Sequence, residues 1–163
     1  MTDRQGIFQR LKADHQRHRE LLDKIGDTTG KSGERRRLLE EFTKEVKSHA
    51  AAEEQSIYAE MLENPATTDE TRHSVAEHHE LDELLNDLAA TDIDSSAWME
   101  KFKKLDHEYR HHINEEEEDH FPEFDEHLDT SQKKDLGDVF LDRKAKEKQK
   151  AEVTPEALED AKA

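Results

Sequence analysis

The chain has 163 residues, of which 31% are hydrophobic and 41% are charged, so the sequence predicts one domain with a thin apolar core. Its 25 basic and 42 acidic residues give a formal net charge of −17, which argues against binding nucleic acid or an anionic membrane, since both need a basic surface. The absence of cysteine excludes disulfides, thiolate zinc sites and iron–sulfur clusters.

No apolar run approaches the roughly 20 residues of a membrane helix. The first residues also lack the apolar core of a signal peptide, so the expected location is the cytoplasm. No segment alternates as a β-strand does, and the expected fold class is therefore all-α.

The first predicted helix covers about residues 3 to 26, and its apolar stripe includes two histidines, His15 and His18. A glycine-rich loop follows at residues 26–33. The second predicted helix covers about residues 34 to 63, and its stripe carries His49 and Glu53 where apolar residues are expected. Asn64-Pro65 closes this helix, because the residue before a proline avoids the helical conformation.

The third predicted helix opens at Thr67 and Glu70, which have capping-box spacing, and carries His78 on its stripe. The fourth begins near residue 95, and its stripe ends in His112 and Glu116. Phe121-Pro122 predicts a kink or break, followed by a short helical piece.

A fifth, short helical segment is expected from Thr130 or Ser131 to about residue 143, followed by a polar tail. Four long helices with short loops predict an up-down-up-down antiparallel four-helix bundle with an additional short C-terminal helix. The expected organisation is a bundle over residues 1–128 and a C-terminal helical segment with a disordered tail over 129–163.

An internal repeat relates the two halves of the chain at an interval of 63 residues. Residues four apart share one face of a helix, so each His-x-x-x-Glu pair can bind one metal ion. The repeat pairs the following residues: His15 with His78, His49 with His112, Glu53 with Glu116, and Tyr58 with Phe121.

Imidazoles and carboxylates together suit iron, manganese, zinc or copper, whereas calcium and magnesium prefer all-oxygen sites. Two glutamates from opposite helices can bridge two ions. An isolated His-x-x-x-Glu pair in a charged helix is usually a surface feature. Six such groups on apolar stripes need a common explanation, because a buried carboxylate without a partner costs several kcal/mol.

Other polar residues near the predicted site leave alternatives open. His18, whose repeat-mate is Leu81, is a fifth histidine ligand, a donor that orients a ligand, or a core residue. Tyr109 either packs in the core or hydrogen-bonds a bound oxygen species. Glu54 and Glu117 are repeat-mates that can substitute for the proposed glutamates. The remaining histidines are expected at the surface: His73, His79, His107, His111, His120 and His127.

Over about residues 5 to 128 the sequence resembles the hemerythrin-like family, the HHE cation-binding bundle. The matching stretches are Asp14-His15, His49 to Glu54 with Ile57-Tyr58, Glu77-His78, and His112 to Glu117 with Phe121-Pro122. The resemblance implies a non-haem centre of two iron ions, with oxo or hydroxo and glutamate bridges, in preference to manganese or zinc.

The chain departs from the oxygen-carrying members at three positions. Their third helix usually has two histidines four apart, whereas in this chain the positions four residues before and after His78 are Ser74 and Asp82. Their fourth-helix carboxylate is usually an aspartate five residues after its histidine, whereas here Glu116 stands four residues after His112. The chain thus resembles the bacterial and sensor-type branch more than the carriers.

The resemblance implies O2, peroxide or NO as ligands. The expected function is oxidative-stress defence by catalase- or peroxidase-like breakdown of hydrogen peroxide, or O2, NO or redox sensing through a separate protein partner. The alternatives are iron storage or metal buffering, and a structural bundle without a functional metal.

Overall fold

The computed structural model describes residues 6–30 and 33–150, and all regular structure in these ranges is helical. In chain order the helices are α1 (Ile7–Gly26), α2 (Gly33–Glu54), α3 (Ile57–Glu63), α4 (Thr68–Ala89), α5 (Ser96–Glu115), the π-helical turn η2 (Glu116–His120), α6 (Phe121–Asp125) and α7 (Thr130–Lys150). None of the helices within these ranges is long and apolar enough to cross a membrane.

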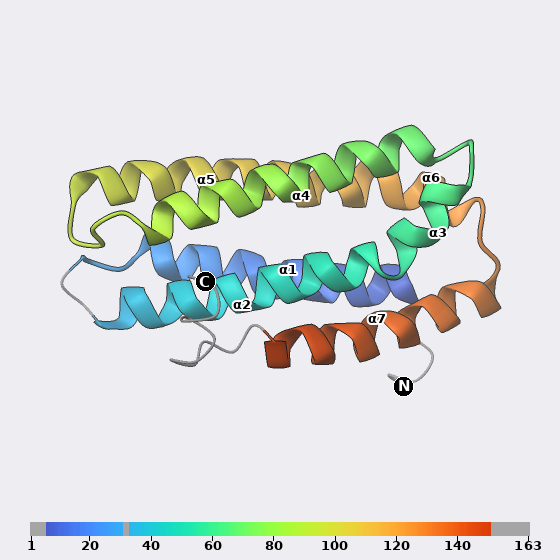
Figure 1. The fold of residues 1–163 in the computed structure, drawn as a ribbon, viewed down its shortest axis with the longest axis horizontal. Coiled ribbons are helices and arrows are strands. Elements are labelled where there is room, and N and C mark those ends of the chain that lie inside the picture. Colours follow the sequence, from blue (N-terminus) through green and yellow to red (C-terminus); the bar gives the residue numbers. More distant parts are fainter. Residues whose placement is uncertain (1–5, 31–32, 151–163) are drawn as a thin grey trace, which may run out of the picture.

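The four long helices α1, α2, α4 and α5 form the expected antiparallel bundle, which confirms the predicted fold class. Figure 1 shows the α4–α5 pair lying along the α1–α2 pair, with α3 and α6 together at one end. Helix α1 packs on α2 and α5, and α4 packs on α5 and α2, so the four helices enclose a common interior.

The interior consists of two apolar clusters separated by a polar layer. One cluster contains Trp98, Phe102 and Phe42 and fills the end of the bundle near the α4–α5 loop. The other contains Phe121 and Phe124 and fills the end near α3 and α6. In α1, α2 and α5, histidines occupy the buried positions between the residues of the two clusters. The helical stripes therefore place a polar layer inside the bundle, shielded at both ends.

The predicted second helix is interrupted at Gln55-Ser56, where α2 ends and α3 begins. The Ser56 hydroxyl donates to the Ala52 carbonyl at 2.7 Å, a bond that competes with the backbone hydrogen bonds of the helix. The interruption follows Glu53, and η2 begins at the repeat-mate Glu116. Each half of the chain thus departs from regular helix immediately after its central glutamate.

The helical irregularity expected at Phe121-Pro122 lies earlier, in η2, where the Phe121 amide donates to the Glu116 carbonyl five residues back. Pro122 stands in the first turn of α6, a position whose amide has no helical partner in any case. Phe124 belongs to the predicted short helical piece, and its side chain is buried.

Helix α7 is longer than predicted, because it continues to Lys150 where a polar tail was expected from about residue 143. It packs along α2 and α1, buries Phe140 completely, and places Lys144 2.8 Å from Asp14 and 3.4 Å from Glu45. These partners lie on other helices, which explains why the sequence of α7 alone suggested a solvated end. The start of the first predicted helix and the tail after residue 150 lie outside the described residues, and the division at residue 128 stays a prediction.

Candidate metal centre

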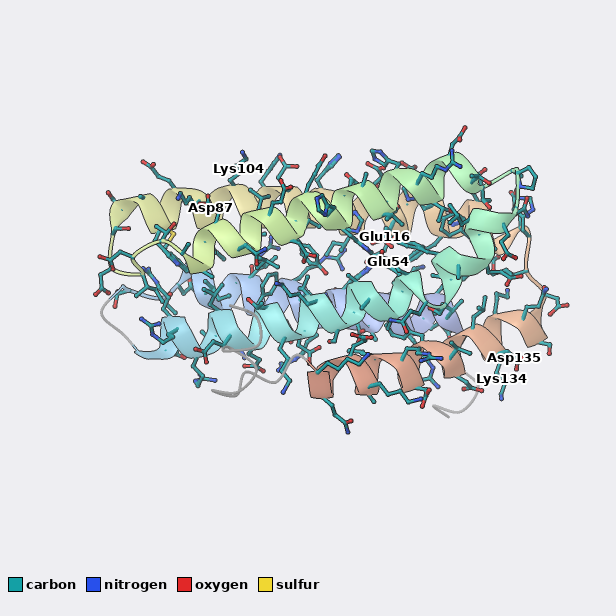
Figure 2. The ribbon with its side chains drawn as sticks, viewed as in Figure 1. Glu54, Asp87, Lys104, Glu116, Lys134 and Asp135 are labelled. Atoms are coloured by element: carbon teal, nitrogen blue, oxygen red, sulfur yellow. The ribbon has the colours of Figure 1, made fainter. Side chains whose placement is uncertain are left out.

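The structure brings together the six side chains that the repeat singled out, in the polar layer between the two apolar clusters. Their exposed fractions are all below one tenth: His15 0%, His49 2%, Glu53 0%, His78 8%, His112 2% and Glu116 1%. Figure 2 shows Glu116 in the interior, between the α4–α5 and α1–α2 pairs, whereas Lys104 and Asp87 lie toward the outer surface.

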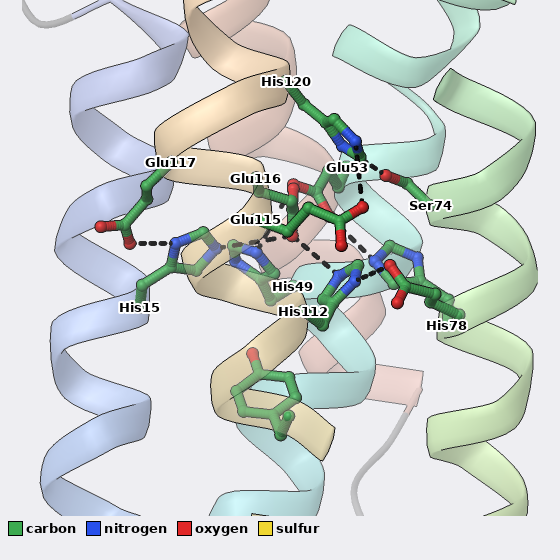
Figure 3. Close-up of polar contacts among 12 residues, drawn as sticks. His15, His49, Glu53, Ser74, His78, His112, Glu115, Glu116, Glu117 and His120 are labelled. Carbon is green, nitrogen blue, oxygen red and sulfur yellow. Dashed lines mark hydrogen bonds and ion pairs between the residues drawn. The ribbon is translucent and has the colours of Figure 1, made fainter. Parts of the chain in front are cut away.

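Each of these four imidazoles is held at Nδ1 by a carboxylate, as in Figure 3 for His15 and Glu117. The pairs are His15 with Glu117 at 2.7 Å, His49 with Asp14 at 2.9 Å, His78 with Glu54 at 3.1 Å, and His112 with Glu77 at 3.0 Å. A carboxylate acceptor at Nδ1 fixes the ring and leaves the lone pair on Nε2, an arrangement found around metal-ligating histidines.

The same 63-residue interval relates these supporting carboxylates in the sequence, since Asp14 and Glu77 are repeat-mates, as are Glu54 and Glu117. Glu54 and Glu117, predicted as substitute ligands, thus accept hydrogen bonds from imidazoles and do not point into the centre. Asp14 and Glu77 were not predicted as site residues. The interval that connects them was the available signal, although it does not reveal which histidine each one contacts.

The two central glutamates each face imidazoles of both halves. Glu53 has Oε1 3.0 Å from His78 Nε2 and Oε2 3.9 Å from His49 Nε2. Glu116 has Oε1 2.8 Å from His112 Nε2 and 3.9 Å from His15 Nε2. Both carboxylates therefore lie where they can bridge two neighbouring ions.

The hydroxyl of Tyr58 donates to Glu116 Oε2 at 2.8 Å, and its ring stacks on His78 with centroids 5.4 Å apart. Its repeat-mate Phe121 stacks on His15 at 5.9 Å and has no hydroxyl to offer Glu53. The two halves thus share their ring packing but differ in one hydrogen bond to the central carboxylates.

Electrostatics in this layer follow from burial. Burial lowers the pKa of His49 to about 4, although Asp14 opposes the shift, so this ring is neutral at pH 7 with a lone pair on Nε2. Burial opposes charge on His112 as well, but Glu116 outweighs it and raises that pKa to about 9. Burial and the Glu116 charge raise the pKa of Glu53 well above its usual range. A cation between these groups competes with their protons, so metal binding releases protons here.

His18 and Tyr109 lie at one end of this layer. His18 is completely buried, its Nδ1 lies 2.7 Å from the Tyr109 hydroxyl, and its ring centroid is 5.1 Å from that of His49. Its Nε2 has no hydrogen-bond partner among the described residues. Burial lowers the pKa of His18 well below its usual value, so the ring is neutral. The equivalent positions in the other half are Leu81 and Val46, which are apolar.

One predicted surface histidine is buried. His120 is 5% exposed, and its Nδ1 lies 2.9 Å from the Ser74 hydroxyl, because the extra width of the π-helical turn directs this residue inward. The other five predicted surface histidines are exposed, as expected: His73, His79, His107, His111 and His127.

A small cavity of about 10 Å³ opens beside the layer, lined by His49, His78, His112 and Tyr109 among others. A volume of this size holds about one water molecule. Any ligand that reaches the centre from this side without movement of the chain must therefore be as small as a few atoms.

The donor set fits a pair of transition-metal ions. Ligand-type atoms of Glu53, His78, His112 and Glu116 lie within 4.8 Å of one another, as do those of His15, His49 and Glu53. The Nε2 atoms of His15 and His49 are buried without a hydrogen-bond partner among the described residues, and Glu53 Oε1 faces the Nε2 atom of His78 at 3.0 Å. Leaving such groups unpaired costs several kcal/mol, whereas a cation satisfies them together.

Comparison with known proteins agrees with this chemistry. The model of the hemerythrin HHE cation binding domain family matches residues 6–124. No curated protein sequence matches significantly. A crystal structure of a hemerythrin HHE cation binding domain-containing protein from Mycobacterium kansasii superimposes with a TM-score of 0.79 at 22% identity, covering 88% of each chain, and is therefore similar in fold. The chain belongs to the hemerythrin HHE cation-binding domain family.

Proposed function

We propose that this protein holds two iron ions in the polar layer and uses them to break down hydrogen peroxide. The observation that carries the proposal is the convergence of buried imidazole nitrogens and two carboxylates, including atoms that nothing else in the described chain satisfies. Mixed nitrogen and oxygen donors suit iron, with manganese and zinc as less favoured occupants. The cytoplasmic location stays a prediction from the sequence.

Each half of the chain supplies the imidazoles of one ion in this proposal. His15 and His49 would hold the first ion, and His78 and His112 the second, with the Glu53 and Glu116 carboxylates between them available to both. His18 would complete the coordination of the first ion through its buried Nε2 after a turn of the ring, since this atom has no hydrogen-bond partner among the residues that the structure describes and lies 4.0 Å from Glu45 Oε2. Asp14, Glu54, Glu77 and Glu117 orient the rings through Nδ1.

When bound, a pair of iron ions supplies two-electron redox capacity and Lewis acidity. In the overall reaction one hydrogen peroxide loses two protons and two electrons and becomes O2. A second peroxide takes up these protons and electrons, its O–O bond breaks, and two water molecules form. No further oxidant or reductant is needed, because the two half-reactions balance.

The residues around the cavity support a substrate of this size. The cavity of about 10 Å³ has room for about one water-sized molecule, so a small substrate such as hydrogen peroxide needs the least rearrangement of the chain to enter from this side. With His18 donating its Nδ1 proton to the Tyr109 oxygen, the Tyr109 hydroxyl keeps its own proton for an oxygen species in the cavity. Tyr58 holds Glu116 Oε2 and leaves Oε1 directed at the imidazoles.

The test combines iron content with peroxide turnover. We expect about two irons per chain, charge-transfer bands that respond to azide or peroxide, and one O2 released for every two peroxides consumed. A His49→Ala/His112→Ala double variant is expected to lose both iron and turnover. The matched control is His79→Ala/His107→Ala, which removes two exposed histidines from α4 and α5.

Turnover no faster than that of free iron would refute peroxide breakdown even if two irons are bound. If the double variant does not fold, as judged by circular dichroism, Glu53→Gln removes one bridging charge at nearly constant volume. More than two irons per chain together with assembly into a cage would instead indicate iron storage.

Sensing of O2 or NO is a second candidate, favoured by the contact of α7 with the first half of the centre. Phe140 meets the edge of His49 with centroids 5.4 Å apart, and Lys144 lies 2.8 Å from Asp14, the residue that holds His49. A movement of the His49 ring on ligand binding would therefore shift Phe140 and Lys144 of α7. Ligand binding to the iron protein without turnover, accompanied by altered proteolysis of α7, would favour this candidate.

A further inference from the structure

A second group of histidines lies outside the metal centre, around Glu115, the last residue of α5. His73 Nε2 is 3.0 Å and His120 Nε2 is 3.3 Å from Glu115 Oε1, and His111 Nε2 is 3.3 Å from Oε2. Glu77 Oε1 is 3.4 Å from His73 Nε2. We name these five residues the outer histidine cluster.

The spacing of the cluster matches that of ligands around one ion. Zinc–nitrogen and zinc–oxygen bonds of about 2.0–2.2 Å in a tetrahedral site place neighbouring ligand atoms about 3.3–3.5 Å apart. The distances of 3.0 and 3.3 Å from His73 and His120 to one oxygen of Glu115 are close to this value. Ligand atoms of His73, Glu77 and Glu115 also lie within 4.8 Å of one another.

The support beneath His120 is an independent indication. Its ring is buried, its Nδ1 lies 2.9 Å from the Ser74 hydroxyl, and its Nε2 is directed at Glu115, as Figure 3 shows. The repeat-mates of Ser74 and His120 are Leu11 and Ile57, two buried apolar residues. Packing at this position therefore does not require a polar pair, whereas a His120 ring fixed so that it holds the ligand carboxylate of Glu115 does.

The π-helical turn explains how Glu115 and His120 come together. Five residues separate them, and the wider turn of η2 brings residues at this spacing onto one side of the helix. The same turn keeps Glu116 directed into the central layer, so consecutive glutamates serve the two locations.

We propose that the outer histidine cluster binds one divalent transition-metal ion of the zinc type, separate from the two ions of the centre. His73, Glu77 and Glu115, whose ligand atoms lie within 4.8 Å of one another, are the ligands, and water completes the tetrahedron on the exposed side. His120 Nε2, 3.3 Å from Glu115 Oε1, holds this carboxylate in place. Glu77 links this site to the centre, because its Oε1 also lies 3.0 Å from His112 Nδ1.

Zinc titration of the iron-loaded protein tests the site, with calorimetry for affinity and metal analysis after desalting for both metals. One zinc per chain is expected to bind while the iron content stays unchanged. His73→Ala and Glu115→Gln are each expected to weaken this binding by about tenfold or more. His73 is half exposed, so its replacement leaves the fold intact.

The matched control is His79→Ala, on the same helix, because His79 is exposed and contacts a single carboxylate, Glu83, at 3.3 Å. This variant is expected to bind zinc as the unchanged protein does. The proposal is overturned if no zinc binds, if His79→Ala weakens binding as much as His73→Ala, or if iron leaves as zinc enters. The iron count is read separately. If the centre takes up no iron, zinc can enter it as well, and the outer site is then the one equivalent of zinc that is lost in His73→Ala and kept in His79→Ala.

Discussion

His18 is the residue that most clearly distinguishes the two ion positions of the centre. Its neutral ring is completely buried next to His49, and its Nε2 has no hydrogen-bond partner among the described residues, whereas the other half has Leu81 at the equivalent position. Because its Nε2 lacks a hydrogen bond and lies 4.0 Å from Glu45 Oε2, we propose that this nitrogen turns to the first ion when the centre is loaded.

His18→Leu makes this position of the first half identical to that of the second. We expect the variant to retain the ion held by His78 and His112 but to lose most of the other, so that iron falls from about two toward one per chain after dialysis against a chelator. Tyr109→Phe is the control, because it removes the hydrogen bond to His18 and keeps the ring. Two irons retained in His18→Leu would show that His18 is not a ligand.

At the scale of residues, helical spacing predicted which six side chains the fold brings together, because residues four apart share a face whatever their surroundings. It did not reveal the partners of Nδ1, since Glu117 reaches His15 and Glu54 reaches His78 from neighbouring helices. Such contacts depend on how the helices cross. The burial of His120 depends on the single extra residue of η2, which leaves the hydrophobic pattern almost unchanged.

At the scale of elements, the junction of α4 with α6 carries two carboxylates in contact, Glu70 and Glu123. Loss of hydration, the hydrogen bond with Glu123 and the nearby charges of Glu123 and Asp69 raise the pKa of Glu70 to about 7. A carboxyl whose pKa is raised by folding is most stabilising when protonated. The contribution of Glu70 to the free energy of unfolding is complete below about pH 4.5 and is lost as the pH rises through about 7.

Glu70→Gln resembles the protonated form at every pH. We expect it to raise the free energy of unfolding by about 1 kcal/mol at pH 8, the size expected for a partly solvated group, and by little at pH 5. Urea unfolding of both proteins at the two pH values measures the difference. Glu80→Gln, on the exposed side of α4, should give no such dependence. An equal effect of Glu70→Gln at both pH values would contradict this explanation.

The sequence predicted the helices of the bundle but not their interruptions or the full length of α7. Apolar periodicity marks a helix face, and it continues across Gln55-Ser56 because α2 and α3 bury residues on the same side. Lys144 and Lys148 read as solvated in isolation, yet both pair with Glu45 of α2. Stabilisation that comes from another element leaves no periodic signal in the segment it stabilises.

At the scale of the whole molecule, we expect the buried polar layer to make stability depend on metal. Two carboxylates and five imidazoles lie inside a bundle whose apolar residues are only 31% of the chain. Binding at one hundred times the dissociation constant stabilises the folded state by about 2.7 kcal/mol per site. For a chain of this length that corresponds to a rise in melting temperature of about 5 °C or more.

We therefore expect removal of iron by a chelator to lower the melting temperature by at least this amount, and added iron to restore it. Thermal scans of His49→Ala/His112→Ala should be insensitive to iron, since the centre cannot load. Equal melting temperatures of the metal-free and iron-loaded protein would argue for a structural bundle without a functional metal.

The 63-residue interval also has an evolutionary consequence. A bundle assembled from two identical two-helix chains would repeat every substitution on both sides of its symmetry axis. This chain does not, because His18, the Tyr58 hydroxyl, and the Ser74–His120 pair each occur on one side alone. Duplication and fusion of an ancestral helical hairpin would have freed the halves to diverge, so that the polar groups of one half no longer need to match those of the other.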